Sequence, residues 1–153
     1  MPSHHETRAL PHSADEMYAL VADMERYPEF LPWCGAARIR DRHPDDGKRQ
    51  VMDVDIVASF KVFRERFGTR VVLDPEARVI DSRLLDGPFR QLHSRWAFRA
   101  LADGGCEVDY RVEFEFRNAV LRRVMNTVFA EAQARIMKAF ERRAADLYGR
   151  RGA

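Results

Sequence analysis

The chain has 153 residues, of which 46% are hydrophobic and 33% are charged, and its formal net charge is +2. These values predict one folded domain over residues 1–153 that can bury a substantial core. No apolar run approaches the roughly 18 residues of a membrane span, and the N-terminus lacks the basic start and apolar stretch of a secretory signal peptide.

The two cysteines, Cys34 and Cys106, lie far apart and lack the spacing of metal ligands. We therefore expect buried, reduced thiols and neither a zinc site nor a disulfide framework. A cytoplasmic location follows as an expectation.

Charge is divided unevenly along the chain. From Arg117 to the C-terminus there are nine basic and three acidic residues, a net charge of +6, and the remainder carries −4. A basic terminal element indicates either an anionic partner, such as phospholipid headgroups or RNA, or simply a solvated helix face.

The N-terminal region predicts a strand over residues 5–10 and then a short helix. Ser13-Ala14-Asp15-Glu16 is a capping box, in which the Ser13 hydroxyl accepts from the third helical amide while Glu16 reaches back to the cap. Apolar residues then recur at helical spacing, namely Met17, Leu20, Val21 and Met24. One apolar stripe is therefore predicted, ending before Tyr27.

An aromatic segment punctuated by prolines follows: Tyr27-Pro28-Glu29-Phe30-Leu31-Pro32-Trp33-Cys34. Proline cannot occupy a regular helix interior or a central strand, and it pushes the preceding residue toward extended geometry. Four large apolar side chains are thus predicted to lie on a turn. Because turns are usually polar, we expect these side chains either to plug the core or to line a ligand site.

The stretch from Trp33 to Arg117 alternates with a period of two and carries turn signals about every dozen residues, which is typical of an antiparallel meander. Turns are predicted at Pro44-Asp45-Asp46-Gly47, Asp74-Pro75-Glu76, Asp86-Gly87-Pro88 and Asp103-Gly104-Gly105. Alternation predicts three inward faces, running from Met52 to Phe60, from Leu92 to Ala100 and from Cys106 to Phe116.

Residues 119–148 return to helical spacing, with apolar residues at steps of three and four and Gly149 as the stop. At 1.5 Å per residue this helix is about 45 Å long, enough to cross a strongly curved sheet. A curved antiparallel sheet wrapped around one long C-terminal helix, with a short helical segment after the first strand, is an α+β helix-grip fold.

On these motifs the chain resembles the START-like polyketide cyclase/dehydrase superfamily, and within it the coenzyme Q-binding protein family. The resemblance covers nearly the whole chain. It is carried by the segment Tyr27 to Cys34, by Leu85-Asp86-Gly87-Pro88-Phe89-Arg90-Gln91-Leu92 leading to Trp96 and Phe98, and by the tail from Phe140 to Gly149.

The resemblance implies a single START-like lipid-binding domain with a deep apolar tunnel between sheet and helix. Its ligand is expected to be ubiquinone or another isoprenoid quinone, with no other cofactor, handled by a carrier or chaperone that supports respiratory electron transport. Close relatives are ribosome-association toxins, which makes the large ribosomal subunit the alternative partner. Transient contact with a membrane surface, peripheral at the inner membrane, is also expected, and DNA is not.

The predicted ligand-binding residues come from the aromatic segment, the strands and the long helix: Tyr27, Phe30, Leu31, Trp33, Phe63, Glu65, Pro88, Phe89, Trp96, Phe98, Tyr110, Val124, Val128 and Phe129. Five of them are expected to form a rim that dips into the bilayer: Phe30, Leu31, Trp33, Pro88 and Phe89. For each aromatic the alternative is that it only fills the core. A pair of Glu65 with an arginine, or the pair of Asp81 with Arg83, is expected either to orient a quinone head or to form a buried ion pair.

Nothing in the sequence predicts a catalytic residue or a metal site. His4, His5 and His12 precede the predicted core, and His43 and His93 fall in a turn or on an outward strand face. None is placed to act as a general acid or base. The chain also lacks a phosphate-binding glycine loop and a nucleophile elbow, so we expect no enzyme activity.

Overall fold

The computed structural model describes residues 3–44, 49–60 and 63–149, with the side chains at 43, 44, 60 and 63 outside that description. Most of the predicted turn at residues 44–47 also lies outside the described residues. The elements, in order, are β1 Ser3–Leu10, α1 Ala14–Ala22, the 3-10 helix η1 Met24–Glu29, β2 Cys34–Pro44, β3 Gln50–Phe60, β4 Phe63–Asp74, β5 Val79–Asp86, β6 Phe89–Ala100, β7 Cys106–Phe116 and α2 Ala119–Tyr148.

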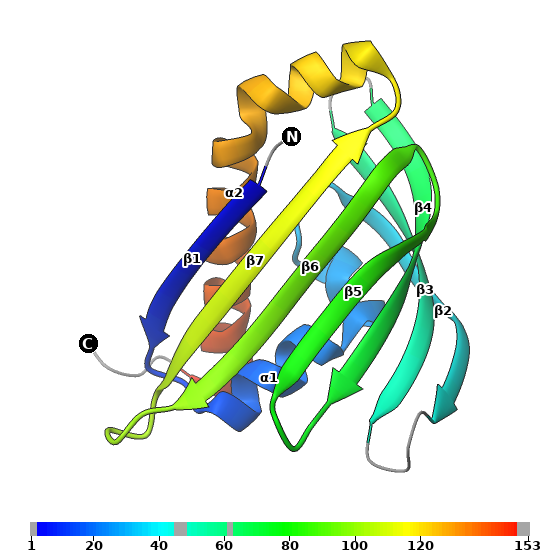
Figure 1. Cartoon of the computed structure of the whole chain (residues 1–153). Helices are drawn as coiled ribbons and strands as arrows, with labels where there is room; N and C mark the ends of the chain where they lie inside the picture. Colours follow the sequence, from blue (N-terminus) through cyan, green and yellow to red (C-terminus); the bar gives the residue numbers. More distant parts are fainter. Residues whose placement is uncertain (1–2, 45–48, 61–62, 150–153) are drawn as a thin grey trace.

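One antiparallel sheet of seven strands forms the body of the molecule, in the order β1-β7-β6-β5-β4-β3-β2. The sheet curves around α2, whose first turns run across one end of the sheet before the helix turns down along the concave side (Figure 1). The helices α1 and η1 lie in the connection from β1 to β2. The predicted α+β helix-grip fold is therefore confirmed.

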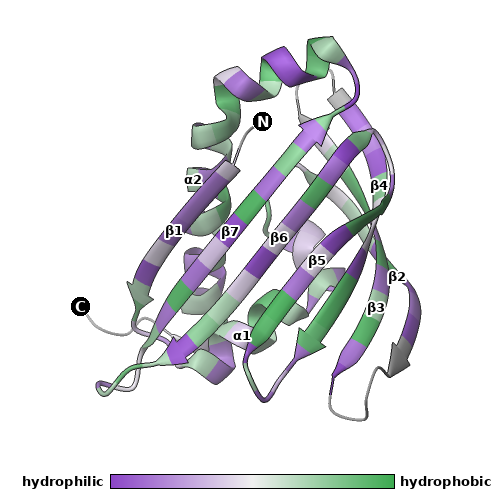
Figure 2. Ribbon diagram, viewed as in Figure 1, coloured by the Kyte–Doolittle hydropathy of each residue, from purple (hydrophilic) through white to green (hydrophobic). Residues whose placement is uncertain are grey.

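Alternation along the strands sets which face of the sheet is buried. On β7 all six residues of the predicted inward face, from Cys106 to Phe116 in steps of two, are buried. Figure 2 shows hydrophobic and hydrophilic residues alternating along this strand and along β6. An antiparallel sheet with this alternation exposes one face to water and packs the other against the core. Here α2 covers the apolar face.

The predicted capping box starts α1. The Ser13 hydroxyl accepts from the amide of Glu16 at 3.1 Å, and the Glu16 carboxylate accepts from the amide of Ser13 at 3.0 Å. The apolar stripe then buries Met17 and Val21 against the sheet. The two reciprocal bonds satisfy amides that the first turn of a helix leaves open.

The aromatic segment is more regular than predicted, because residues 24–29 form a 3-10 helix that contains Pro28. At its two ends, the amide of Arg26 donates to the carbonyl of Asp23, and the amides of Phe30 and Leu31 both donate to the carbonyl of Tyr27. Pro28 supplies no N–H to η1, and a 3-10 helix as short as this one tolerates one missing bond. The chain turns only after η1, at residues 30–33.

The end of α2 is tied to the start of the chain by a buried histidine. The amide of Gly149 donates to the carbonyl of Ala145, and the Gly149 carbonyl accepts from Nε2 of His12 at 2.8 Å. His12 is only 4% exposed, so it is buried in the folded protein, and the prediction that it precedes the core is wrong. Its ring satisfies a carbonyl that the helix terminus would otherwise leave open.

Phe140 of α2 joins the helix to the aromatic segment and to the sheet. Its ring centroid lies 5.5 Å from that of Tyr27, 5.3 Å from that of Phe30 and 5.0 Å from that of Trp96. All three contacts are edge-to-face, the arrangement that aromatic rings prefer. These four rings therefore plug one end of the space between α2 and the sheet.

Trp33 is the strained residue of the segment. Its φ of 66° lies in the left-handed region, where a bulky side chain is a genuine outlier. The conformation costs about 1–2 kcal/mol for an L-residue and is held in part by the Trp33 carbonyl, which accepts from the amide of Ser59 on β3 at 2.7 Å. Strain of this kind persists where surrounding contacts fix it.

Replacing Phe140 with alanine is expected to lower the free energy of unfolding by about 3–5 kcal/mol, because the ring is 2% exposed and its loss leaves a cavity. Urea denaturation followed by circular dichroism measures this change. Leu147→Ala on the same helix, at a side chain that is 52% exposed, is the control and is expected to cost less than about 1 kcal/mol. Equal losses would contradict the role given to the Phe140 cluster.

Replacing Trp33 with glycine is expected to give a protein about 0.5–1 kcal/mol more stable than replacing it with alanine. Both variants lose the indole, but only glycine adopts a left-handed φ without strain, which outweighs its larger unfolded-state entropy. Thermal and urea unfolding of the two variants measure the difference. A more stable alanine variant would show that the backbone relaxes here at no cost.

Candidate functional site

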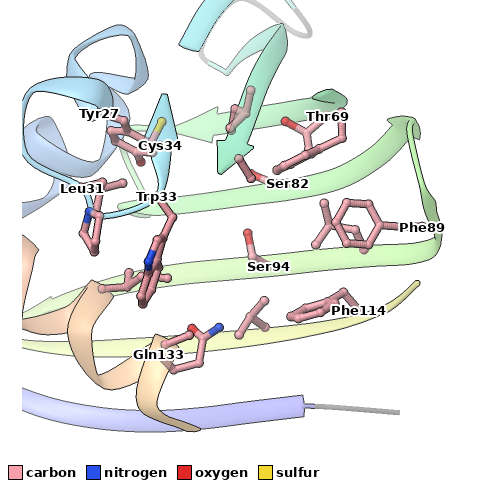
Figure 3. A pocket seen from close by; sticks show the side chains of 18 of the residues that line it. Tyr27, Leu31, Trp33, Cys34, Thr69, Ser82, Phe89, Ser94, Phe114 and Gln133 are labelled. Atoms are coloured by element: carbon pink, nitrogen blue, oxygen red, sulfur yellow. The ribbon is translucent and has the colours of Figure 1, made fainter. Parts of the chain in front are cut away.

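A cavity of about 290 Å³ lies between the concave face of the sheet and α2. Its walls come from η1 and the segment after it, from strands β2 to β7, and from the middle of α2 (Figure 3). Ligand pockets usually measure roughly 300–1,000 Å³, so this cavity is at the lower end of that range.

The opening of the cavity lies beside the aromatic segment. Leu31, Pro32, Trp33 and Cys34 all line the cavity while remaining partly exposed. Val128, facing them from α2, is also partly exposed. The cavity is therefore accessible to solvent between this segment and α2.

The opposite end is closed by stacked phenylalanines. Phe89 is buried, lies 4.5 Å from Phe116 in a stacked arrangement, and meets Phe67 and Phe114 edge-to-face. The prediction that Phe89 forms an exposed rim is therefore wrong. Gly87 with φ 137° makes the preceding turn, and a Cβ there would lie 2.6 Å from Cβ of Phe67, so only glycine lets the turn pack against β4.

Three hydroxyl groups line the sheet side of the cavity, from Thr69 on β4, Ser82 on β5 and Ser94 on β6. Ser82 and Ser94 are directly paired across the two strands, and Figure 3 shows all three side chains pointing into the space. Their hydroxyls make no hydrogen bond to another residue in the described part of the chain. Because these hydroxyls face the cavity and have no protein partner there, the patch is suited to a ligand that accepts hydrogen bonds.

A fourth polar group comes from the helix. Gln133 is 5% exposed, and its Oε1 accepts from the hydroxyl of Tyr110 at 2.8 Å. Burial raises the pKa of Tyr110 well above its ordinary value, so the phenol stays protonated and keeps donating to Gln133. This bond orients the Gln133 side chain and leaves its amide NH2 group on the cavity (Figure 3).

The described residues that line the cavity include no Asp, Glu, His, Lys or Arg. Cys34 is the one thiol among them, and burial raises its pKa above the ordinary value, which keeps it protonated and weakly nucleophilic at neutral pH. Tyr27 is likewise held protonated by burial, with its hydroxyl donating to the carbonyl of Val21. This arrangement can bind an uncharged apolar molecule, but it offers no group poised for proton transfer.

The structure places half of the predicted binding residues on the cavity: Tyr27, Leu31, Trp33, Phe89, Trp96, Tyr110 and Val128. Six others lie off it: Phe30, Glu65, Pro88, Phe98, Val124 and Phe129. The side chain of Phe63 lies outside the described residues. Whether any of these side chains contacts a ligand stays a prediction.

Several of the residues off the cavity have other contacts. Phe30 packs on Tyr27 and Phe140, and Phe129 lies 5.2 Å from Phe114 as part of the core. Asp81 bonds to Arg83 and His93 on the face of β5 opposite to Ser82, so the predicted use of the Asp81–Arg83 pair to orient a ligand is wrong.

The polar lining was mostly missed from the sequence. Thr69 and Ser82 occupy inward positions of strands whose other inward residues are apolar, such as Val71 and Ile80. Gln133 lies four residues after Phe129 on the buried stripe of α2. A polar residue in an otherwise apolar inward register was the signal that would have found all three.

Among the described residues, no helix is long and apolar enough to span a membrane.

Two kinds of relative resemble this chain in sequence. The "Ribosome association toxin RatA" of Pseudomonas aeruginosa is 33% identical over 150 residues, which cover 97% of this chain and all of that protein. The "Coenzyme Q-binding protein COQ10 homolog B, mitochondrial" of Xenopus laevis is 28% identical over 152 residues, which cover 95% of this chain and 59% of that longer protein.

Solved structures agree with the fold. The 18 kDa protein CC1736 from Caulobacter crescentus has a TM-score of 0.82 and 35% identity, over 98% of this chain and all of that one. A START superfamily protein from Mycobacterium smegmatis has a TM-score of 0.79, over 95% of this chain and 98% of that one. The Zhui aromatase/cyclase from Streptomyces has a TM-score of 0.76, over 94% of this chain and 93% of that one. At 20% and 19% identity, these two show the fold alone.

The relatives named above are called a toxin and a binding protein, whereas an enzyme appears among the more distant structures. Residues 10–141 match the family described as "Polyketide cyclase / dehydrase and lipid transport". This match covers most of the chain, and it agrees with the helix-grip architecture and the internal apolar cavity. The chain therefore belongs to the polyketide cyclase/dehydrase and lipid transport family, with a START-like fold.

Proposed function

We propose that the protein binds a prenylated quinone, such as ubiquinone, in this cavity and acts as its carrier or chaperone in respiratory electron transport. One observation carries the proposal: the cavity is apolar, its described lining residues include no charged group, and its hydroxyl donors have no partner among the residues that the structure describes. The name of the Xenopus laevis relative supports the choice of ligand.

The polar patch fits the head of such a ligand. The carbonyl and ether oxygens of a quinone ring only accept hydrogen bonds, and hydroxyl and amide groups supply donors. Ser82 and Ser94 lie side by side on the sheet, and Gln133 lies on the helix across the cavity. Trp33 and Trp96, which also line the cavity, provide flat apolar walls for the ring.

The size of the cavity limits how much of the ligand it holds. Each buried CH2 group contributes about 0.8 kcal/mol, so one isoprene unit contributes about 3–4 kcal/mol before the cost of ordering it. A cavity of about 290 Å³ accommodates a ring with a short length of chain. A longer tail then leaves through the opening beside Leu31 and Trp33.

Binding without catalysis is the role that the lining supports. A cyclase or dehydratase needs a positioned acid or base with a tuned pKa. The ionisable groups among the described lining residues are the phenols of Tyr27 and Tyr110 and the thiol of Cys34, all of which burial keeps protonated.

A second candidate function is association with the large ribosomal subunit. It is favoured by two relatives, 33% and 34% identical, that are named as toxins, and by the basic C-terminal segment. Binding of this kind would depend steeply on salt, because it releases counterions from RNA phosphates.

The first test is mass spectrometry of the organic extract of protein purified under mild conditions. We expect a near-stoichiometric isoprenoid quinone in the native protein and at least a tenfold loss in Val128→Glu, which places a carboxylate on the apolar cavity. Val124→Glu, one turn earlier on α2, at a side chain that is 38% exposed and off the cavity, is the matched control and should retain the ligand. An extract without quinone, with the protein cosedimenting with large ribosomal subunits at low salt, would favour the second candidate.

Ser94→Ala is expected to weaken quinone affinity about fivefold, the effect of losing a hydrogen bond of about 1 kcal/mol. The free energy of unfolding should change by less than about 0.5 kcal/mol, because the Ser94 hydroxyl has no partner in the described residues of the empty protein. Quenching of tryptophan fluorescence by a short-chain quinone measures the affinity. Ser59→Ala is the control, since its buried hydroxyl also lacks a hydrogen-bond partner in the described structure but lies off the cavity. Equal effects of the two substitutions would remove Ser94 from the binding site.

A further inference from the structure

A second hollow, of about 490 Å³, lies against the outer side of the aromatic segment. Residues 28–32 form one wall, and the last part of α2 forms the other with four cations, Arg135, Lys138, Arg142 and Arg143. We call this hollow the basic groove. Leu31 and Pro32 line both the basic groove and the apolar cavity, so the two spaces share one wall.

Two of the four cations are already paired. Arg143 bonds to Glu29 at 2.7 Å and lies over the ring of Phe30, with Cζ 5.1 Å from its centroid, while Arg135 bonds to Glu131 at 2.8 Å. The pair with Glu29 fixes the segment to α2 and leaves the groove between them.

The other two cations are not neutralised by an ion pair. Lys138 and Arg142 are exposed and form no ion pair with another residue in the described ranges. The acidic residues that line the groove are Glu29 and Asp146, so four cations face two anions there. The groove has a net positive charge and two cations free to bind an external anion.

We propose that the basic groove binds phosphate headgroups of an anionic phospholipid bilayer. Lys138 and Arg142 contact the phosphates, and the apolar side chains of Leu31 and Pro32 meet the edge of the hydrocarbon region. Docked in this way, the protein turns the opening of the apolar cavity toward the lipid. This inference rests on the proposed function, because it names the surface from which the cavity would receive its ligand.

The surroundings of the groove favour a bilayer over RNA. Sequence-independent binding of single-stranded RNA uses aromatic rings with a free face on which bases stack. Phe30 is the aromatic ring on the groove, and it is occupied by edge-to-face contacts with Tyr27 and Phe140 and by the guanidinium of Arg143. An apolar wall beside free cations matches the boundary between headgroups and acyl chains.

The test is sedimentation of the full chain with vesicles of phosphatidylcholine alone and with vesicles in which a third of the lipid is phosphatidylglycerol. We expect binding to the anionic vesicles only, weakened about 25-fold in the double variant Lys138→Gln/Arg142→Gln, since each cation near an anionic surface contributes about fivefold. Arg123→Gln is the control. Arg123 is also exposed and forms no ion pair in the described structure, but it lies about 22 Å before Lys138 along α2. Its loss is expected to change binding by less than twofold.

The proposal is overturned if the native protein does not sediment with anionic vesicles, or if the double variant binds them as the native protein does. Loss of ribosome cosedimentation in the double variant, with vesicle binding intact, would also overturn it and assign the groove to RNA.

Quinone content is measured in parallel. A double variant that keeps its quinone while losing vesicle binding supports the groove's role, whereas native protein that binds vesicles but holds no quinone refutes the proposed ligand and leaves the docking surface standing.

Discussion

The structure depends on the mismatch in width between one helix and the sheet that it must cover. Seven strands about 4.8 Å apart span about 29 Å, whereas a helix with its side chains is about 10–12 Å wide. Curving the sheet brings its edges toward α2 but does not close the gap. The apolar inward face therefore needs further side chains to complete the core, and where they do not reach, a cavity remains.

The aromatic segment supplies those side chains on the side of β2. Tyr27 and Phe30 pack around Phe140 and fill part of the gap, while Leu31 and Trp33 stop short of filling the rest and line the cavity. The two roles expected as alternatives, plugging the core and lining a site, are thus divided within one short segment. The left-handed backbone at Trp33 is part of the cost of turning the chain from η1 into β2 at this position.

The same segment separates two environments of opposite chemistry. Its inner side contacts the apolar cavity, and its outer side contacts the basic groove through Phe30, Leu31 and Pro32. The ion pair of Glu29 with Arg143 holds it to α2. A change in this pair would affect the shape of both spaces, because Leu31 and Pro32 are common to them.

The sequence by itself determined the fold and most of the secondary structure, with the 3-10 helix η1 as an exception. The capping box at Ser13, the alternation from Cys106 to Phe116 and the helical spacing of residues 119–148 are local patterns, and each depends on periods that the backbone imposes. Only the tertiary structure decided which apolar residues border the cavity. Val124 and Val128 lie four residues apart on the same face of α2. Val124 is nevertheless exposed to solvent whereas Val128 lines the cavity, because the path of α2 over the curved sheet decides which part of that face meets the cavity. Long-range packing likewise decided that Thr69, Ser82 and Gln133 meet across the cavity from three different elements, a juxtaposition that no local pattern encodes.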